Sequence, residues 1–289
     1  MTRDYSAARG ANRPDRPARF QSNEFRASWS QLAADGALPF EAAGPSMCAG
    51  PIGSTTMPTP PVLLPTRVDE GHGPGVMYRI QGELVPTLHV RVDGSMPIYF
   101  EHHVILWKDP AMQVGMHKLQ GAFKRVIAGM PVFMTELQSP GEAAFSRDDP
   151  GHVLSLHLPA GQHILVREHQ FLAATGNVDY TFTRVKGVSN MLFGGTGFFI
   201  DRFEAQGGEG IVWMHGYGNV FEKALDPGEA IDVESGGWVY RDGSVAMQQV
   251  VYGLKTGFLG GSGQLVFNRF SGPGRVAIQS AYVHLPTEN

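Results

Sequence analysis

Cysteine is almost absent from this chain, because its 289 residues include a single one, Cys48. One thiol excludes an internal disulfide framework and any zinc site that needs two or more thiolates. Charged residues make up only 17% of the chain, and the formal net charge of −4 lacks the basic excess of a general nucleic-acid binder. No apolar run reaches the ~18 residues that a transmembrane helix needs. The sequence therefore predicts a globular protein without a transmembrane segment, and makes nucleic acid an unexpected partner.

The N-terminal stretch also lacks the apolar segment of a secretory signal. It is rich in arginine, as mitochondrial transit peptides are, but Asp4, Asp15 and Glu24 interrupt that pattern and Pro14 and Pro17 oppose a helix. We therefore expect a cytoplasmic location, with the mitochondrion as the alternative if the source is eukaryotic.

Glycine and proline are abundant instead, with 37 and 20 residues, and their number suits many turns between short strands. They are densest before residue 76, for example in Gly53–Thr66. Residues 1–75 are predicted to form a disordered arm, with one short helix near Phe25–Ala34 and a docking segment at Val62–Leu64. Residues 76–289 are predicted to form the folded core.

The core contains an internal repeat. Windows that begin at Gly94, Gly161 and Gly228 align without gaps and are evenly spaced, which gives a period of about 67 residues. Each window continues into short Val-, Ile- and Phe-rich strands bounded by Gly or Pro-Gly turns. The three glycines are predicted to supply the positive φ of these turns, so changing any of them to valine should lower stability. The repeat predicts an all-β fold of three tandem β-sandwich units, 88–154, 155–221 and 222–288, in a pseudo-threefold arrangement.

Two segments fit this scheme less directly. Val76–Pro86 is a surplus strand ahead of the first unit, and we expect it to pair with a later strand and help close the assembly. Helices are scarce, and His117–Ala128 is the best helical candidate, although an irregular connection would explain it equally well.

The core resembles the family of altered inheritance of mitochondria protein 24 across roughly Val76–Leu285. The order, spacing and turn glycines of five segments carry this resemblance: Phe123–Leu137, Leu158–Phe182, Leu192–Phe203, Gly218–Val245 and Phe270–Ser280. The resemblance implies three β-sandwich units similar to the tryptophan RNA-binding attenuator protein (TRAP), and it implies no reaction and no catalytic residues. Its eukaryotic members are associated with mitochondria. Glu101-His102-His103 departs from the Glu-Pro-Gly turn of the family.

The only candidate metal ligands are weak and lie at equivalent positions of the first two units. They are Glu101, His102, His103, Glu168 and His169. A catalytic zinc site needs three convergent protein ligands, and the third unit offers Ser235-Gly236-Gly237 at this place. Ordinary strand or turn histidines are the better interpretation, so no metal or cofactor is expected.

A nucleic-acid site is the alternative that a TRAP-like fold suggests. Arg202 and Arg269 lie one repeat period apart, and each is followed by a phenylalanine, Phe203 and Phe270. Arginines can contact phosphates and aromatic rings can stack on bases. Because the core is net acidic, the better interpretation is that the two arginines lie on a solvent-facing strand edge without binding nucleic acid.

Known catalytic patterns are missing from the sequence. After Gly161, His163 and His169 are too far apart for the His-x-His pair of a cupin, and strand-like residues follow the glycine runs where a phosphate loop needs a helix. No Gly-x-Ser-x-Gly elbow occurs. The sequence therefore predicts a non-enzymatic scaffold or assembly protein, forming a homo-oligomer or binding a protein partner. A module that binds a small ligand or nucleic acid in a groove between repeats is the alternative.

Overall fold

A computed structural model describes residues 62–63, 69–101, 103–119, 133–147, 149–185, 198–252 and 265–281, all within the unit Met57–Asn289. These residues form 21 β-strands and no α-helix, in four antiparallel sheets. The all-β class predicted from the sequence is therefore confirmed for the described part of the chain. The described residues contain no helix that is long and apolar enough to cross a membrane.

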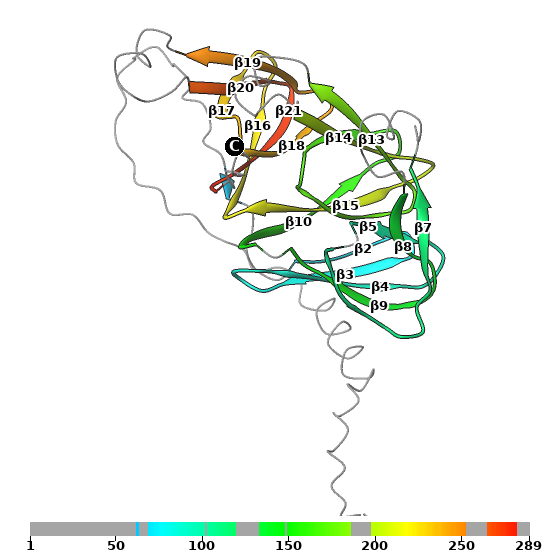
Figure 1. Ribbon diagram of the computed structural model, residues 1–289. Coiled ribbons are helices and arrows are strands. Elements are labelled where there is room, and N and C mark those ends of the chain that lie inside the picture. Colours follow the sequence, from blue (N-terminus) through cyan, green and yellow to red (C-terminus); the bar gives the residue numbers. More distant parts are fainter. Residues whose placement is uncertain are drawn as a thin grey trace, which may run out of the picture. The chain divides into compact units, whose positions relative to one another are not determined.

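The sheets join strands that are distant in the sequence (Figure 1). The five-stranded sheet has the order β2 (Asp69–Gly73), β3 (Val76–Gln81), β4 (Thr87–Val92), β9 (Gly141–Phe145) and β6 (Ile105–Lys108). The six-stranded sheet has the order β10 (Gly151–Leu158), β15 (Gly210–Tyr217), β12 (Phe171–Thr175), β5 (Ile98–Phe100), β8 (Phe133–Leu137) and β7 (Val114–Lys118).

The other two sheets contain the C-terminal strands. The seven-stranded sheet has the order β1 (Val62–Leu63), β16 (Val220–Leu225), β21 (Gly274–Gln279), β18 (Trp238–Asp242), β11 (His163–Arg167), β14 (Phe198–Ala205) and β13 (Val178–Val185). The three-stranded sheet has the order β17 (Ala230–Glu234), β20 (Leu265–Ser271) and β19 (Ala246–Tyr252).

Three apolar clusters separate the four sheets into layers. The first cluster combines β3, β4 and β9 with one face of the six-stranded sheet, where Trp213 and Ile211 of β15 contribute. The second combines the opposite face of that sheet, through Val212 and Met214 of β15, with the seven-stranded sheet. The third lies between the seven-stranded and three-stranded sheets, with Phe270 of β20 among its members. The sheets are therefore stacked in the order five-, six-, seven- and three-stranded.

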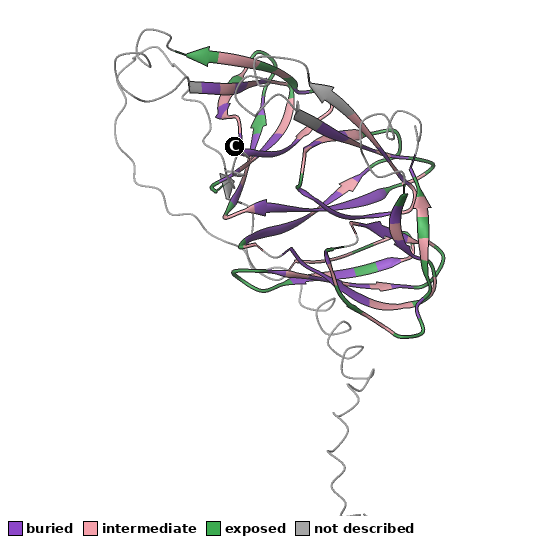
Figure 2. Ribbon diagram, viewed as in Figure 1, coloured by how far each residue is buried: buried purple, intermediate pink, exposed green. Residues whose placement is uncertain are grey.

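This layering explains the burial along each strand. Successive residues of a strand point to opposite faces, so a strand between two cores buries both sets. All residues of β12 are buried, whereas β3 alternates between buried and exposed positions and β19 is mostly exposed or half-buried (Figure 2). The continuous apolar runs of the sequence lie in the inner sheets for this reason.

The predicted turn glycines adopt the expected backbone conformation. Gly94, Gly161 and Gly228 have φ values of 87°, 77° and 85°, respectively. Each lies in the turn just ahead of a strand, and these strands are β5, β11 and β17. The sequence therefore identified correctly the turns that need a left-handed residue.

Several segment predictions differ from the structure. Residues 69–73, predicted as part of the arm, form β2, and β3 of the surplus segment pairs with β2 and β4, its neighbours along the chain. The surplus strand therefore extends one sheet and does not close the assembly. His117 and Lys118 of the helical candidate lie in β7, where they pair with β8, and residues 120–128 lie outside the described residues. The docking expectation holds for Val62 and Leu63, which pair with Glu222 and Phe221.

Candidate functional site

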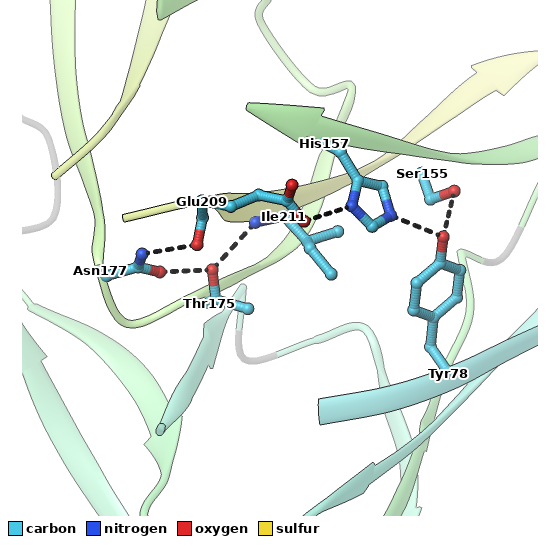
Figure 3. A network of polar contacts seen from close by, with 7 residues as sticks. All are labelled: Tyr78, Ser155, His157, Thr175, Asn177, Glu209 and Ile211. Atoms are coloured by element: carbon cyan, nitrogen blue, oxygen red, sulfur yellow. Dashed lines mark hydrogen bonds and ion pairs between the residues drawn. The ribbon is translucent and has the colours of Figure 1, made fainter. Parts of the chain in front are cut away.

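A polar cluster that links two sheets lies between the β2–β3 hairpin and β10 (Figure 3). Tyr78 of β3 donates its hydroxyl to Ser155 Oγ at 2.9 Å and lies 3.1 Å from His157 Nε2. His157 Nδ1 lies 2.8 Å from Glu209 Oε1. Ser155 donates in turn to Asp69 Oδ2 at 2.9 Å. The chain of contacts therefore runs from a carboxylate on the turn before β15 to a carboxylate at the start of β2.

Local sequence places these side chains on one face. Ser155 and His157 are two residues apart in β10, so they point to the same side as Val153, which belongs to the first apolar cluster. The Tyr78 ring packs edge-on against Trp213, with centroids 5.4 Å apart. Gly71, opposite Tyr78 in β2, leaves the space that the phenol occupies. The network thus lies at the polar margin of an apolar core.

A second group of hydrogen bonds holds the turn that carries Glu209. Thr175 donates to Asn177 Oδ1 at 2.8 Å, and Asn177 Nδ2 donates to the Glu209 carbonyl at 2.8 Å. The Ile211 backbone N–H donates to Thr175 Oγ1 at 3.0 Å (Figure 3). Because Thr175 is fully buried, this arrangement fixes the carboxylate beside His157.

The protons of this network can be counted. Tyr78 and Ser155 have one hydroxyl proton each, and these are donated to Ser155 and Asp69. The contact from His157 Nε2 to the phenol oxygen then requires an N–H, as does the contact from Nδ1 to Glu209. All four contacts are satisfied together when His157 carries a proton on each ring nitrogen.

This geometry limits what the network can do chemically. Burial raises the pKa of Tyr78, and the Asp69 carboxylate adds to the rise while the hydrogen bond with Ser155 opposes it, so the phenol stays neutral near pH 7. Ser155 donates to the Asp69 carboxylate and not to His157, so these two residues do not form the Ser–His pair of an activated serine nucleophile. His157 faces Tyr78 and Glu209. The arrangement therefore serves to tie the β2–β3 hairpin to β10.

Sequence reasoning did not single out these residues. The available signal was the polar pair Ser155 and His157 within the apolar strand 151–158, together with Tyr78 at an alternating position. The long-range partners Asp69 and Glu209 had no sequence signal, because they lie 86 and 52 residues from Ser155 and His157.

The described residues among the weak metal-ligand candidates lie in two separate turns. Glu101 Oε2 is 3.3 Å from both Arg147 Nη2 and His103 Nε2, and Glu168 lies 3.8 Å from His169. Within the described ranges, no group of three or more His, Cys, Asp or Glu side chains could hold a metal ion. His102 lies outside the described residues.

The predicted nucleic-acid residues are engaged within the protein. Phe203 and Phe270 are fully buried, and a ring without exposed surface cannot stack on a base. Arg202 forms an ion pair with Glu204 at 2.5 Å, and Arg269 forms a two-point pair with Asp232 at 2.6 and 2.7 Å. Hydrogen bonds from Arg269 and Tyr252 lower the pKa of Asp232 to about 2. The two phenylalanines are therefore core residues.

These observations define an all-β protein of stacked antiparallel sheets, in which different segments of one chain contribute strands to the same sheet. A family model described as mitochondrial biogenesis AIM24 matches residues 78–281, and the chain belongs to this family. The resemblance inferred from the sequence is thereby confirmed.

A solved structure supports the fold. The X-ray crystal structure of protein SPYM3_0169 from Streptococcus pyogenes is similar to this chain with a TM-score of 0.58 at 19% identity. The match covers 72% of this chain and 94% of the streptococcal one. No curated protein matches the chain.

Proposed function

We propose that this chain is a non-enzymatic assembly protein, built from three TRAP-like β-sandwich repeats, that acts as an oligomer. The observation that carries the proposal is a strand-pairing scheme that recurs in three successive segments of six strands. The first and third strands pair with the sixth, and the second and fourth pair with the fifth. These pairs are β4–β9, β6–β9, β5–β8 and β7–β8; then β10–β15, β12–β15, β11–β14 and β13–β14; then β16–β21, β18–β21, β17–β20 and β19–β20.

Successive segments are joined through strand edges. β5 of the first segment pairs with β12 of the second, and β11 of the second pairs with β18 of the third. Each segment therefore contributes three strands to each of two adjacent sheets, and each inner sheet is shared by two successive segments. Repeats that join in this way can extend by adding further edges, which suits an assembly role.

The polar cluster between the hairpin and β10 supports the non-enzymatic part of the proposal. Ser155 donates to Asp69, and His157 contacts Tyr78 and Glu209, so the two are not paired as a nucleophile and its base. The family description, mitochondrial biogenesis, fits a role in building larger assemblies. The compartment stays a prediction, with the cytoplasm first and the mitochondrion as the alternative for a eukaryotic source.

Native mass spectrometry of the tag-free full-length chain tests this proposal. We expect masses that are whole multiples of the 31.4 kDa chain, without added mass. A chain that stays monomeric at tens of micromolar would overturn the oligomer. A stoichiometric added mass would overturn the assembly function in favour of the alternative, a small-ligand or nucleic-acid site in a groove between repeats.

A further inference from the structure

Each inner sheet consists of two halves that are supplied by two successive segments. One half contains the first, sixth and third strands of a segment, as in β10-β15-β12 and β16-β21-β18. The other half contains the second, fifth and fourth strands of the preceding segment, as in β5-β8-β7 and β11-β14-β13. The halves meet at the antiparallel pairs β5–β12 and β11–β18.

The two end sheets each contain one half without the other. The five-stranded sheet contains β4-β9-β6, extended by β3 and β2, and the three-stranded sheet is β17-β20-β19. The strands that would form a third junction are thus β6 and β17. Neither pairs on its outer side with any strand of the described ranges, so the pseudo-threefold ring does not close through them.

We propose that β17 of one copy pairs antiparallel with the outer edge of β6 of a second copy. This pairing rests on the proposed assembly function and names its partner. It joins the two end sheets into one with the order β2-β3-β4-β9-β6-β17-β20-β19, which repeats the order of the inner sheets. The contact is head-to-tail, because the two copies contribute different edges.

Backbone direction on β17 supports this pairing. The Glu229 carbonyl accepts from Gly272 N at 3.0 Å, so its polar groups face β20. Because such groups alternate along an antiparallel strand, those of Ala230 and Asp232 point away from β20. His163, one repeat period before Ala230, uses the equivalent carbonyl in an inner junction, where it accepts from Gly243 N at 3.1 Å. The group that forms an inner junction is therefore available at the end sheet.

Exposed apolar side chains support the pairing on β6. Ala173 and Ala174 pair with β5 in the inner junction and are fully buried. The residues at the same position of the preceding repeat are Leu106 and Trp107, which are 54% and 44% exposed. Side chains of an added neighbouring strand would cover part of this apolar surface, and side chains of this size gain the most from such burial.

Charge favours β17 as the partner over a second β6. In the β5–β12 junction Ile98 pairs with Thr175, and the repeat spacing applied to this register places Asp232 of β17 opposite Lys108 of β6. Opposite charges across a strand pair stabilise it, and like charges destabilise it. β6 carries Lys108 and β17 carries Asp232 and Glu234, so only a pair of one β6 and one β17 combines opposite charges.

One hydrogen bond of the β5–β12 junction cannot be repeated at the new junction. Gly176 N donates to Pro97 O across the first inner junction at 2.8 Å. Asp109, at the same position of the preceding repeat, donates instead to Glu142 O within its own sheet. We therefore expect an association that is reversible and depends on concentration.

The test uses two variants of the full-length chain, each blocking one edge. The double variant Leu106→Glu/Trp107→Glu removes apolar surface and adds charge that the acidic β17 repels. Ala230→Pro removes an outward N–H at the first residue of β17, where proline is tolerated. The control is Leu84→Glu, at an apolar residue that is 77% exposed and lies outside both edges.

Native mass spectrometry should show that each blocked variant loses at least tenfold in self-association, while the control keeps the wild-type distribution. A mixture of the two blocked variants should form a one-to-one heterodimer and nothing larger, since one free β6 and one free β17 remain. Circular dichroism checks folding, and Ala230→Lys replaces Ala230→Pro if the latter does not fold.

Two results would overturn this pairing. If the blocked variants still assemble like the wild type, the β6–β17 pairing is wrong, although the proposed assembly function stands. A mixture without heterodimer, when the β6 variant alone is monomeric, would indicate a symmetric contact instead. A monomeric wild type would overturn the assembly function itself, and the pairing with it.

Discussion

The inner and end sheets of this protein satisfy different requirements. An inner sheet is covered on both faces, so β12 is buried at every residue. An end sheet is covered on one face, and its other face carries polar groups such as Arg91 and Glu142, or Asp232 and Arg269. One strand-pairing scheme is therefore compatible with two amino-acid patterns. Strands are apolar on both faces where a sheet has two neighbouring sheets, and on one face where it has one.

A matched pair of tryptophans should give the largest difference between these sheets. Trp213 of the inner β15 is fully buried, whereas Trp107 of the end strand β6 is 44% exposed. We expect Trp213→Ala to lower the free energy of unfolding by about 3–5 kcal/mol, because it leaves a cavity. Trp107→Ala should cost less than about 1 kcal/mol in dilute solution. Urea unfolding measures both, and equal losses would contradict the layer order.

The inner sheet should also respond to acid. Burial lowers the pKa of His215 in β15 to about 4, and its Nδ1 has no hydrogen-bond partner among the described groups. The unfolded chain binds this proton near pH 6.5, so the free energy of unfolding falls as the pH drops from 6.5 to about 4. The full loss is about 3 kcal/mol, at ~1.4 kcal/mol per pKa unit.

His215→Gln separates this contribution from other groups. Burial also lowers the pKa of His152, so the wild-type slope alone does not identify the residue responsible. Urea unfolding at pH 7 and pH 5 should show a smaller loss on acidification in the variant than in the wild type. Identical losses would assign the acid sensitivity elsewhere.

The turn glycines should rank by their surroundings. Valine at any of the three positions must adopt a positive φ, which costs roughly 1–2 kcal/mol or more. At Gly94 an added Cβ would also lie 2.7 Å from Pro140 Cδ, whereas nothing lies within 4 Å of a Cβ at Gly161 or Gly228. Thermal unfolding should give Gly94→Val a lower melting temperature than Gly161→Val and Gly228→Val. Asparagine tolerates a positive φ, so Gly161→Asn should lose much less stability than Gly161→Val.

Two tyrosines give the smallest expected difference. Tyr78→Phe removes the hydroxyl that connects the end-sheet hairpin to Ser155 and His157, and should cost about 1–2 kcal/mol. Tyr252→Phe, on the outer face of the other end sheet and 43% exposed, should change stability by less than about 0.5 kcal/mol. Urea unfolding of both variants checks the ranking, and its reversal would contradict a structural role for the network.

Parts of this architecture were predictable because they depend on local sequence. A positive φ at Gly94 follows from a Pro- or Gly-containing turn between strands, and β-class segments follow from Val-, Ile- and Phe-rich runs. The sequence left the place of Phe203 and Phe270 open, because their repeat position is equally consistent with a core and a binding surface. The network around Tyr78 was missed because its contacts span 52 to 86 residues.

The sequence by itself determined the all-β class, the three glycine turns and the family. Only the tertiary structure decided which strands share a sheet, that β3 extends one end sheet, and that β6 and β17 remain edges. The physical reason is that backbone hydrogen bonds between strands are the same for every residue type, so side-chain pattern identifies a strand but not its partner. The partner is chosen by which apolar faces can be buried together, and that choice is made by the whole chain.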